Sequence, residues 1–259
     1  GRADEWSSKS GSGYPTNVRV AGGTTLDLGA DGGEGTEREM SGSLTIEDNG
    51  TLTMNGSSNE MTEALVILGN LVIEANATLE LSSEIGGDLR LEGDWTNAGT
   101  FTANDRAVSF VGSGNQNIIN TTSSDLLEIP FVILDKANAT DRVILDSDMD
   151  IAGLLTLSSG VLDVNTNNHT LRLLSTETRS AFITGSANGS VSGDVTMQRF
   201  IGKNDDASHF RFLTTPFETK IDDAGAMDND RNLLSNVWTQ SSGSGGNASN
   251  VSPNQVSVY

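Results

Sequence analysis

Carboxylates spaced one residue apart are the first feature of this sequence that could support chemistry. Residues 146–150 read Asp-Ser-Asp-Met-Asp, and a second acidic stretch holds Asp228 and Asp230. Oxygen ligands at alternate positions are typical of loops that bind calcium. An EF-type loop would also need glycine at its sixth place and glutamate at its twelfth, where Ile151 and Leu157 stand.

Two interpretations of these acids stay open. One is a calcium site built from Asp146, Asp148 and Asp150, or from the pair Asp228 and Asp230. The other is a solvated face, because alternation along a strand would point the first three acids outward from one strand edge. Calcium is the only cofactor that the sequence suggests.

Carboxylate pairs raise the question of catalysis. Sugar hydrolysis needs two carboxylates about 5–10 Å apart. Asp27 and Glu80 share a column of the repeat described below, although a threonine separates them. Arg142, placed near Asp141 and Asp146, could serve a lyase as proton acceptor. An acidic repeat protein produces such pairs by chance, so we expect no catalytic residues and no enzyme activity.

Histidine and tryptophan point to no catalytic or binding motif. His169 lies in an Asn-rich stretch that is typical of a turn, and His209 is far from it in sequence. Tryptophan can stack against a sugar ring, but Trp6, Trp95 and Trp238 are not spaced as a platform. We expect Trp95 to pack inside the protein and Trp238 to be the best exposed candidate.

A repeat positions these residues. An apolar-x-apolar triplet, a short turn and a Thr-apolar-x-apolar stretch occur three times, with starts at 18, 44 and 71 and steps of 26 and 27 residues. The three copies are 18–28, 44–54 and 71–81. A period of this length predicts a repeat architecture.

The columns of the repeat predict how the copies stack. Leu26, Leu52 and Leu79 align, and apolar residues two apart share one face of a strand. The turn column holds Gly23, Asn49 and Asn76, residue types that tolerate a left-handed backbone. These features predict an all-β fold, a parallel β-solenoid whose coils stack about 4.8 Å apart, with Thr25, Thr51 and Thr78 as an outward ladder.

The solenoid should continue beyond the three copies. About seven coils fit between 18 and 200 at the early period. A right-handed β-helix is expected from the general crossover preference. Later strands are expected at 131–134, 143–145, 154–157, 161–164 and 171–173.

Composition limits the partners. The chain has 259 residues with 15 basic and 35 acidic side chains, so its net charge is −20. Such a surface repels nucleic acid and anionic lipid. The chain has no cysteine, which excludes disulfides and thiolate metal sites. The sequence has no apolar run of 18 residues, so it predicts no membrane insertion.

Four regions are expected along the chain. They are an N-terminal lead-in (1–17), the solenoid (18–200), an irregular C-terminal cap region (201–240) and a Ser/Gly/Asn-rich linker (241–259) into a missing downstream part. The chain opens with glycine, which indicates a processed, trimmed or fragmentary product. Four aromatic side chains could plug the open end of the stack: Phe200, Phe210, Phe212 and Phe217.

Three stretches carry a family resemblance. "GDWTNAGTFTA", "GLLTLSSGVLDV" and "VSGDVTMQRFI" resemble the β-solenoid regions of large secreted surface proteins of Bacteroidetes-type bacteria, over roughly 18–217. The matching residues are Gly93, Trp95, Asn97, Gly99, Phe101, Gly153, Leu155, Thr156, Leu157, Ser159, Gly160, Leu162, Val191, Gly193, Val195 and Arg199. The resemblance implies type IX secretion, a cell-surface location and a role as stalk, adhesin or matrix component, and it brings no catalytic set.

Together these observations predict a non-enzymatic extracellular structural or adhesive module, such as a stalk, surface-layer, matrix or fibre component. Its expected partners are surface glycans or other copies of itself, which could join end to end as a filament. The alternatives are a carbohydrate-binding or polysaccharide-degrading β-helix and a calcium-dependent binding module.

Overall fold

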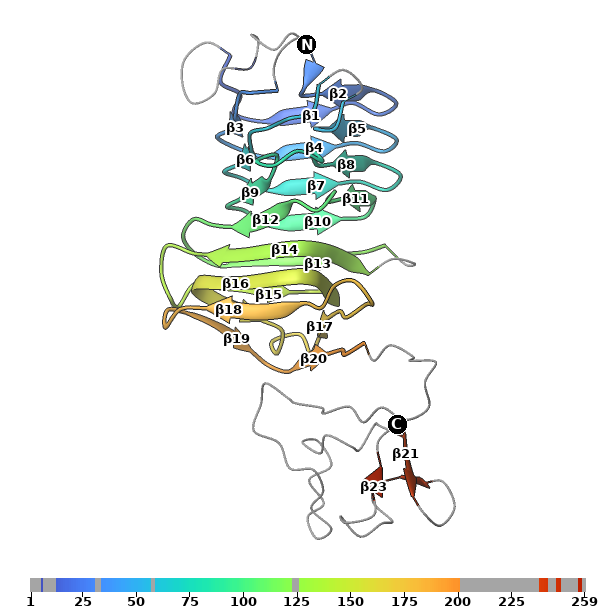
Figure 1. The fold of residues 1–259 in the computed structure, drawn as a ribbon. Coiled ribbons are helices and arrows are strands. Elements are labelled where there is room, and N and C mark those ends of the chain that lie inside the picture. Colours follow the sequence, from blue (N-terminus) through green and yellow to red (C-terminus); the bar gives the residue numbers. More distant parts are fainter. Residues whose placement is uncertain are drawn as a thin grey trace. The chain divides into compact units, whose positions relative to one another are not determined.

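The computed structural model describes Trp6 and residues 13–30, 34–56, 59–122 and 126–200, together with the backbone of three short strands after residue 237. The chain forms two compact units, Gly1–Ile201 and Gly202–Tyr259. The first unit is a parallel β-solenoid of about seven turns, which confirms the predicted fold (Figure 1). The hand of its coils stays a prediction.

The first strand of each coil forms one face of the solenoid, face A. Its strands stack in parallel in the order β1 (Val18–Val20), β4 (Leu44–Ile46), β7 (Leu71–Ile73), β10 (Trp95–Asn97), β13 (Gln116–Asn120), β15 (Arg142–Leu145), the end of β16 (Met149–Asp163) and β19 (Gly189–Ser192). Their alternation puts one side chain in two into the interior.

The second strand of each coil forms face B. In the first four coils these strands are β2 (Thr25–Asp27), β5 (Thr51–Thr53), β8 (Thr78–Glu80) and β11 (Thr100–Thr102). Leu26 pairs with Leu52 and Leu52 with Leu79, so the predicted vertical file is confirmed. The threonine ladder is confirmed as well, and Thr100 extends it by one rung.

Left-handed residues make the corner between faces A and B, as predicted. Gly23, Asn49 and Asn76 have φ values of 70°, 61° and 58°. In each case the next residue donates its N–H to a carbonyl three positions earlier, at 2.6–3.1 Å. A residue with a bulky β-branched side chain could not take this backbone without strain, which explains why the column holds only glycine and asparagine.

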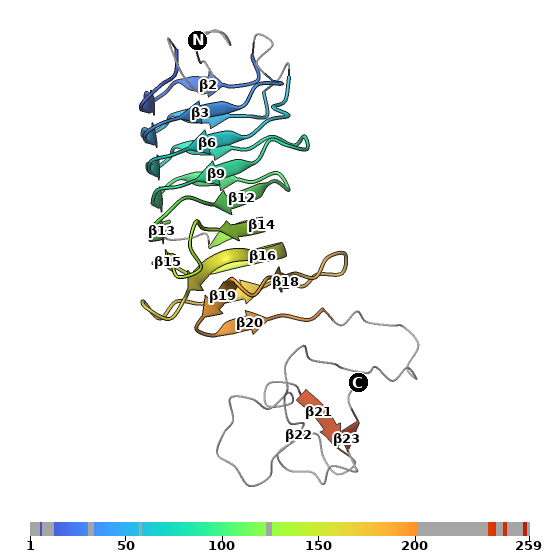
Figure 2. The same cartoon turned by 90° about the vertical axis from the view of Figure 1, so that its left-hand side faces the viewer.

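The third strand of each coil forms face C (Figure 2). Its strands are β3 (Arg38–Met40), β6 (Leu65–Ile67), β9 (Leu89–Leu91), β12 (Ala107–Phe110), part of β14 (Leu127–Asp135), the middle of β16 and β18 (Phe182–Gly185). The repeat pattern missed β3 and β6.

The later coils vary more in length, and their faces merge. β14 and β16 run through the corner between faces B and C without a break, and β16 continues into face A. Their first parts, followed by β17 (Leu171–Leu173) and β20 (Val195–Met197), take the place of face B. Each of the five predicted later strands lies within or overlaps an observed strand.

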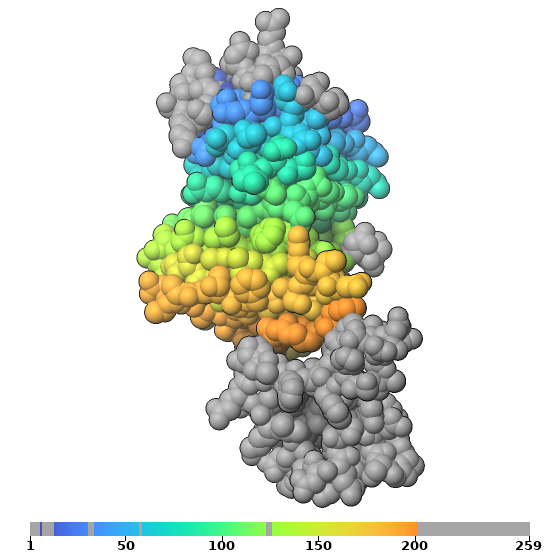
Figure 3. Space-filling model, in the orientation of Figure 1, coloured from blue at the N-terminus to red at the C-terminus, as the bar shows by residue number. Residues whose placement is uncertain are grey.

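The interior is one continuous apolar core that extends from Val20 to Ala181. The coils follow one another as an unbroken block in Figure 3. At least half of the core side chains are fully buried, including Trp95, Phe110 and Leu79. Because each coil covers the apolar residues of its neighbours, stacking supplies the burial that a single coil lacks.

The second unit is described only through a small antiparallel sheet. It consists of β21 (Trp238–Ser241), β22 (Gly246–Asn247) and β23 (Val256–Ser257). β22 and β23 lie in the predicted linker. The rest of the predicted cap and linker, with Phe210, Phe212 and Phe217, lies outside the described residues. No helix long and apolar enough to cross a membrane occurs in the described part of the chain.

Candidate functional site

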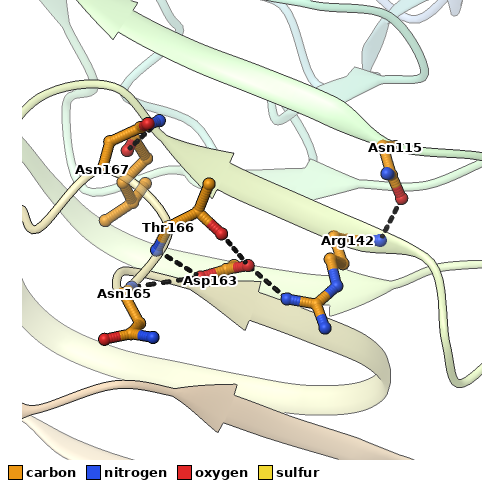
Figure 4. Close-up of polar contacts among 7 residues, drawn as sticks. Asn115, Arg142, Asp163, Asn165, Thr166 and Asn167 are labelled. Atoms are coloured by element: carbon orange, nitrogen blue, oxygen red, sulfur yellow. Dashed lines mark hydrogen bonds and ion pairs between the residues drawn. The ribbon is translucent and has the colours of Figure 1, made fainter.

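A network of polar contacts lies in the sixth and seventh coils, and Asp163 is at its centre (Figure 4). Asp163 ends the face A part of β16, and its side chain is 1% exposed. It accepts hydrogen bonds from the backbone N–H groups of Asn165 and Thr166, both at 3.0 Å, and from the Thr166 hydroxyl at 2.7 Å. The Arg142 guanidinium completes the set.

Asp163 is held in its ionised form. Burial acts to raise its pKa, but the hydrogen bonds from Thr166, Arg142 and Asn165 outweigh burial and lower the pKa below its ordinary value of 3.8. A carboxylate with such a low pKa cannot serve as a general acid at neutral pH. Its contacts show instead that it anchors the turn after β16 and ties that turn to β15.

The three acids of the candidate calcium loop bind separate partners in the next coil. Asp150 receives two hydrogen bonds from Arg172, Nε to Oδ1 at 2.7 Å and Nη2 to Oδ2 at 2.6 Å. Asp148 accepts the Thr170 N–H at 2.8 Å. Asp146 accepts from the side-chain amide of Asn167.

The solvated face expected for these acids is wrong for Asp150. Asp150 is only 5% exposed, although it occupies an outward position between two core residues of β16. The reason is its register, which places Asp150 directly beside Arg172 of β17. The bidentate guanidinium covers the carboxylate and neutralises it.

No group of three or more His, Cys, Asp or Glu side chains that could hold a metal ion occurs among the described residues. Asp228 and Asp230 lie outside that part of the chain. Calcium at either set of acids therefore stays a prediction.

The residues considered for catalysis are not brought together. Arg142 binds Asp163. Asp141 accepts hydrogen bonds from Asn138 at 2.9 Å and from the Gly114 N–H at 3.0 Å, which lower its pKa. Asp146, the third residue of the possible lyase site, accepts a hydrogen bond from Asn167 in the following coil, whereas Asp141 is bonded to Gly114 in the preceding coil.

The face B acids are also engaged. Thr53 pairs with Asp27 on one side and with Glu80 on the other, as the columns predicted. Glu80 accepts hydrogen bonds from Thr53 at 3.1 Å and from the side chains of Asn55 and Asn104 at 3.3 and 3.2 Å. The column serves to connect three coils.

Histidine and tryptophan occupy structural positions. His169 follows a turn, and its Nδ1 lies 3.4 Å from Asp148. Trp95 is fully buried, as expected, and packs edge-on against Phe101 with ring centroids 4.8 Å apart. Trp6 packs against the core, and its indole donates to the Glu39 carbonyl at 2.8 Å. The side chain of Trp238 lies outside the described residues.

A ladder of side-chain acceptors at the start of face A was missed. Asn17, Ser43, Asn70 and Asp94 each accept the backbone N–H of the next coil, at 2.8, 3.0, 2.9 and 2.7 Å. The last donor is Asn117. The sequence could have revealed this ladder, because each of the four acceptor residues directly precedes a face A strand.

A buried lysine was also missed. Lys136 is 3% exposed, and its Nζ donates to the Val111 carbonyl at 2.6 Å and to the side-chain oxygen of Gln116. Gln116 in turn donates to the Leu91 and Gly93 carbonyls at 3.1 and 2.7 Å. Lys136 has no counterpart in the early repeat, so periodicity could not reveal this network.

These contacts show what the arrangement does chemically. Five of the carboxylates described above accept a hydrogen bond from an adjacent coil and so cross-link the stack: Glu80, Asp146, Asp148, Asp150 and Asp163. No family model, no curated protein and no solved structure matches this chain.

Proposed function

We propose that this chain is a non-enzymatic extracellular structural or adhesive module that works as a stalk, surface-layer, matrix or fibre component. One observation carries the proposal. The polar side chains that could have formed a reactive site, Asp150, Asp163 and Glu80, are instead bonded to the neighbouring coil.

The physical consequence is a stiff and acidic stack. Eight face A strands at about 4.8 Å per rung span roughly 34 Å. Backbone ladders, the apolar core and side-chain cross-links all act along the same axis. A net charge of −20 favours solubility. A module of this kind can hold an attached segment away from a surface.

Export to the cell surface is proposed on the resemblance to secreted surface proteins. The partners of the protein would be surface glycans or other copies of the chain.

Limited proteolysis combined with a turnover assay tests the proposal. The purified chain should yield a protease-resistant fragment close to 18–200 and release no products from neutral or acidic polysaccharides. Release of new reducing ends or of unsaturated sugars, abolished by Asp163→Asn, would contradict it. Thr45→Ala, an outward substitution on face A, is the matched control.

A further inference from the structure

Two parallel files of uncharged side chains lie on the outer side of face C in the fifth to seventh coils. Phe131 pairs with Leu154, and Leu154 pairs with Phe182. Two residues further along each strand, Ile133, Thr156 and Thr184 form the second file. We call these six residues the outer C plane; β14, β16 and β18, which carry it, lie one below another in Figure 2.

The plane is accessible except at Phe131, where the Arg179 guanidinium lies over the ring, 5.5 Å from its centre. Phe182 is 55% exposed and Thr184 is exposed, while the other four side chains are half-buried. Phe131, Leu154 and Phe182 are large apolar side chains in register on an outer face. Outward positions usually carry polar groups in a solvated sheet.

The absence of charge sets the plane apart from the rest of the same file. In the first three coils the file of Ile133 holds Glu39, Val66 and Arg90, two of which are ionisable. From the fourth coil onward it holds Ser109, Ile133, Thr156 and Thr184, none of them ionisable. In a chain with a net charge of −20, an uncharged plane matches an uncharged occupant.

The size of the plane limits the occupant further. Its three rungs span about 10 Å along the stack, and its two files lie about 7 Å apart. An area on the order of 100 Å² is far below the ~800 Å² that each partner contributes to a stable protein interface. The plane suits a narrow ligand that runs along the stack.

We infer that the outer C plane binds a neutral linear polysaccharide, an inference that rests on the adhesive form of the proposed function. A sugar ring has an apolar C–H face and a rim of hydroxyls. The file of Phe131, Leu154 and Phe182 offers apolar contact, and the Thr156 and Thr184 hydroxyls offer hydrogen bonds two residues away. Arg179, whose guanidinium lies 5.5 Å from the centre of the Phe131 ring, adds donors at the margin.

Native gels cast with a soluble polysaccharide test this inference on the full chain. Neutral xylan, mannan and mixed-linkage glucan are the probes, and anionic alginate is the comparison. At least one neutral probe should retard the protein more than alginate does. Phe182→Ala and Leu154→Ala should each weaken that retardation about five- to tenfold, while Thr45→Ala on face A should leave it unchanged.

Three outcomes would overturn the inference. These are no retardation by any neutral probe, equal retardation of Phe182→Ala and Thr45→Ala, and a concentration-dependent dimer that Phe182→Ala abolishes. The proposed function fails separately, through product release in the turnover assay. Melting temperatures of the variants, expected to be close to that of the parent chain because the residues face outward, show that each variant is folded.

Discussion

Lys136 illustrates how a single residue connects the coils of the stack. Its ammonium group is buried and bonded to Val111 and Gln116, and burial lowers its pKa below 10.5. Gly160 makes room for the lysine, since a Cβ atom at that position would lie 2.6 Å from the Lys136 Cγ. A glycine that the repeat could not explain therefore has a packing role.

We predict that Lys136→Ala lowers the free energy of unfolding by about 2–4 kcal/mol, because it leaves a cavity and unbonded acceptors. Lys136→Met should cost less, since it fills the space without a buried charge. Denaturant titrations measure both values. Equal losses for the two variants would contradict this account.

The pH dependence of Lys136 has a defined sign. Between its lowered folded-state pKa and the unfolded value of 10.5, the unfolded chain binds more protons, so the parent chain gains stability as pH rises. The stability difference between the parent chain and Lys136→Met should shift in favour of the parent over that interval. An unchanged difference at pH 7 and pH 10 would argue against a buried charge.

Asp163 gives the same sign over a lower pH range, because its folded-state pKa is lowered as well. Its folded-state pKa lies below 3.8, so its contribution is present above that pH and is lost as pH falls through the folded-state value. We predict that Asp163→Asn lowers the free energy of unfolding by about 1–3 kcal/mol at pH 7. The loss should shrink as pH falls below 3.8, which denaturant melts at pH 7 and at acid pH can check.

At the scale of elements, the hairpin between β17 and β18 links distant coils. Ser175 and Ser180 form an antiparallel bridge, and the turn brings Arg179 within 2.8 Å of Asp105, which lies 74 residues earlier in the loop between β11 and β12. β14 and β16 carry no loop where they cross the corner between faces B and C. The hairpin therefore acts as a strap that ties the seventh coil to the fourth and fifth coils.

We predict that Arg179→Ala speeds amide exchange in β18 and β19 about fivefold. The ion pair with Asp105 is exposed and contributes little by itself, but the contact with Phe131 adds to it. Hydrogen exchange followed by mass spectrometry measures the effect, with Arg199→Ala as control. Identical exchange in both variants would show that the strap does not restrain the final coils.

The elements also show what sequence could and could not reveal. The sequence predicted the stacking of Leu26, Leu52 and Leu79 because the interval between faces A and B keeps a constant length. β3 and β6 stayed hidden because they follow loops without a fixed pattern. Residues 65–67 are all buried, so they show no alternation.

The candidate site was only partly predictable for a related reason. The acids at 146–150 were recognised by type, but their partners Arg172 and Asn167 lie 21–22 residues later, a shorter step than the early period. The partner of a charged residue in the next coil can be identified only if the number of residues between the two coils is known. Because the early period did not give that number here, the sequence alone made Asp150 look like a solvated residue.

At the scale of the whole molecule, stability should depend on neighbours on both sides of a coil. Leu79 is fully buried between two coils, whereas Leu26 in the first coil is only partly buried. We predict that Leu79→Ala costs about 2–5 kcal/mol and that Leu26→Ala costs less than half as much. Thermal or denaturant melts compare the two; equal losses would argue against stability that builds from coil to coil.

β16 has a consequence for how this protein can change over evolution. Its fifteen residues turn through all three faces as one strand. Insertion or deletion of one residue inside it would exchange inner and outer side chains on every face downstream of the change. Related genes should therefore gain and lose codons in the connections between strands, or by whole coils, and keep the length of 149–163 constant.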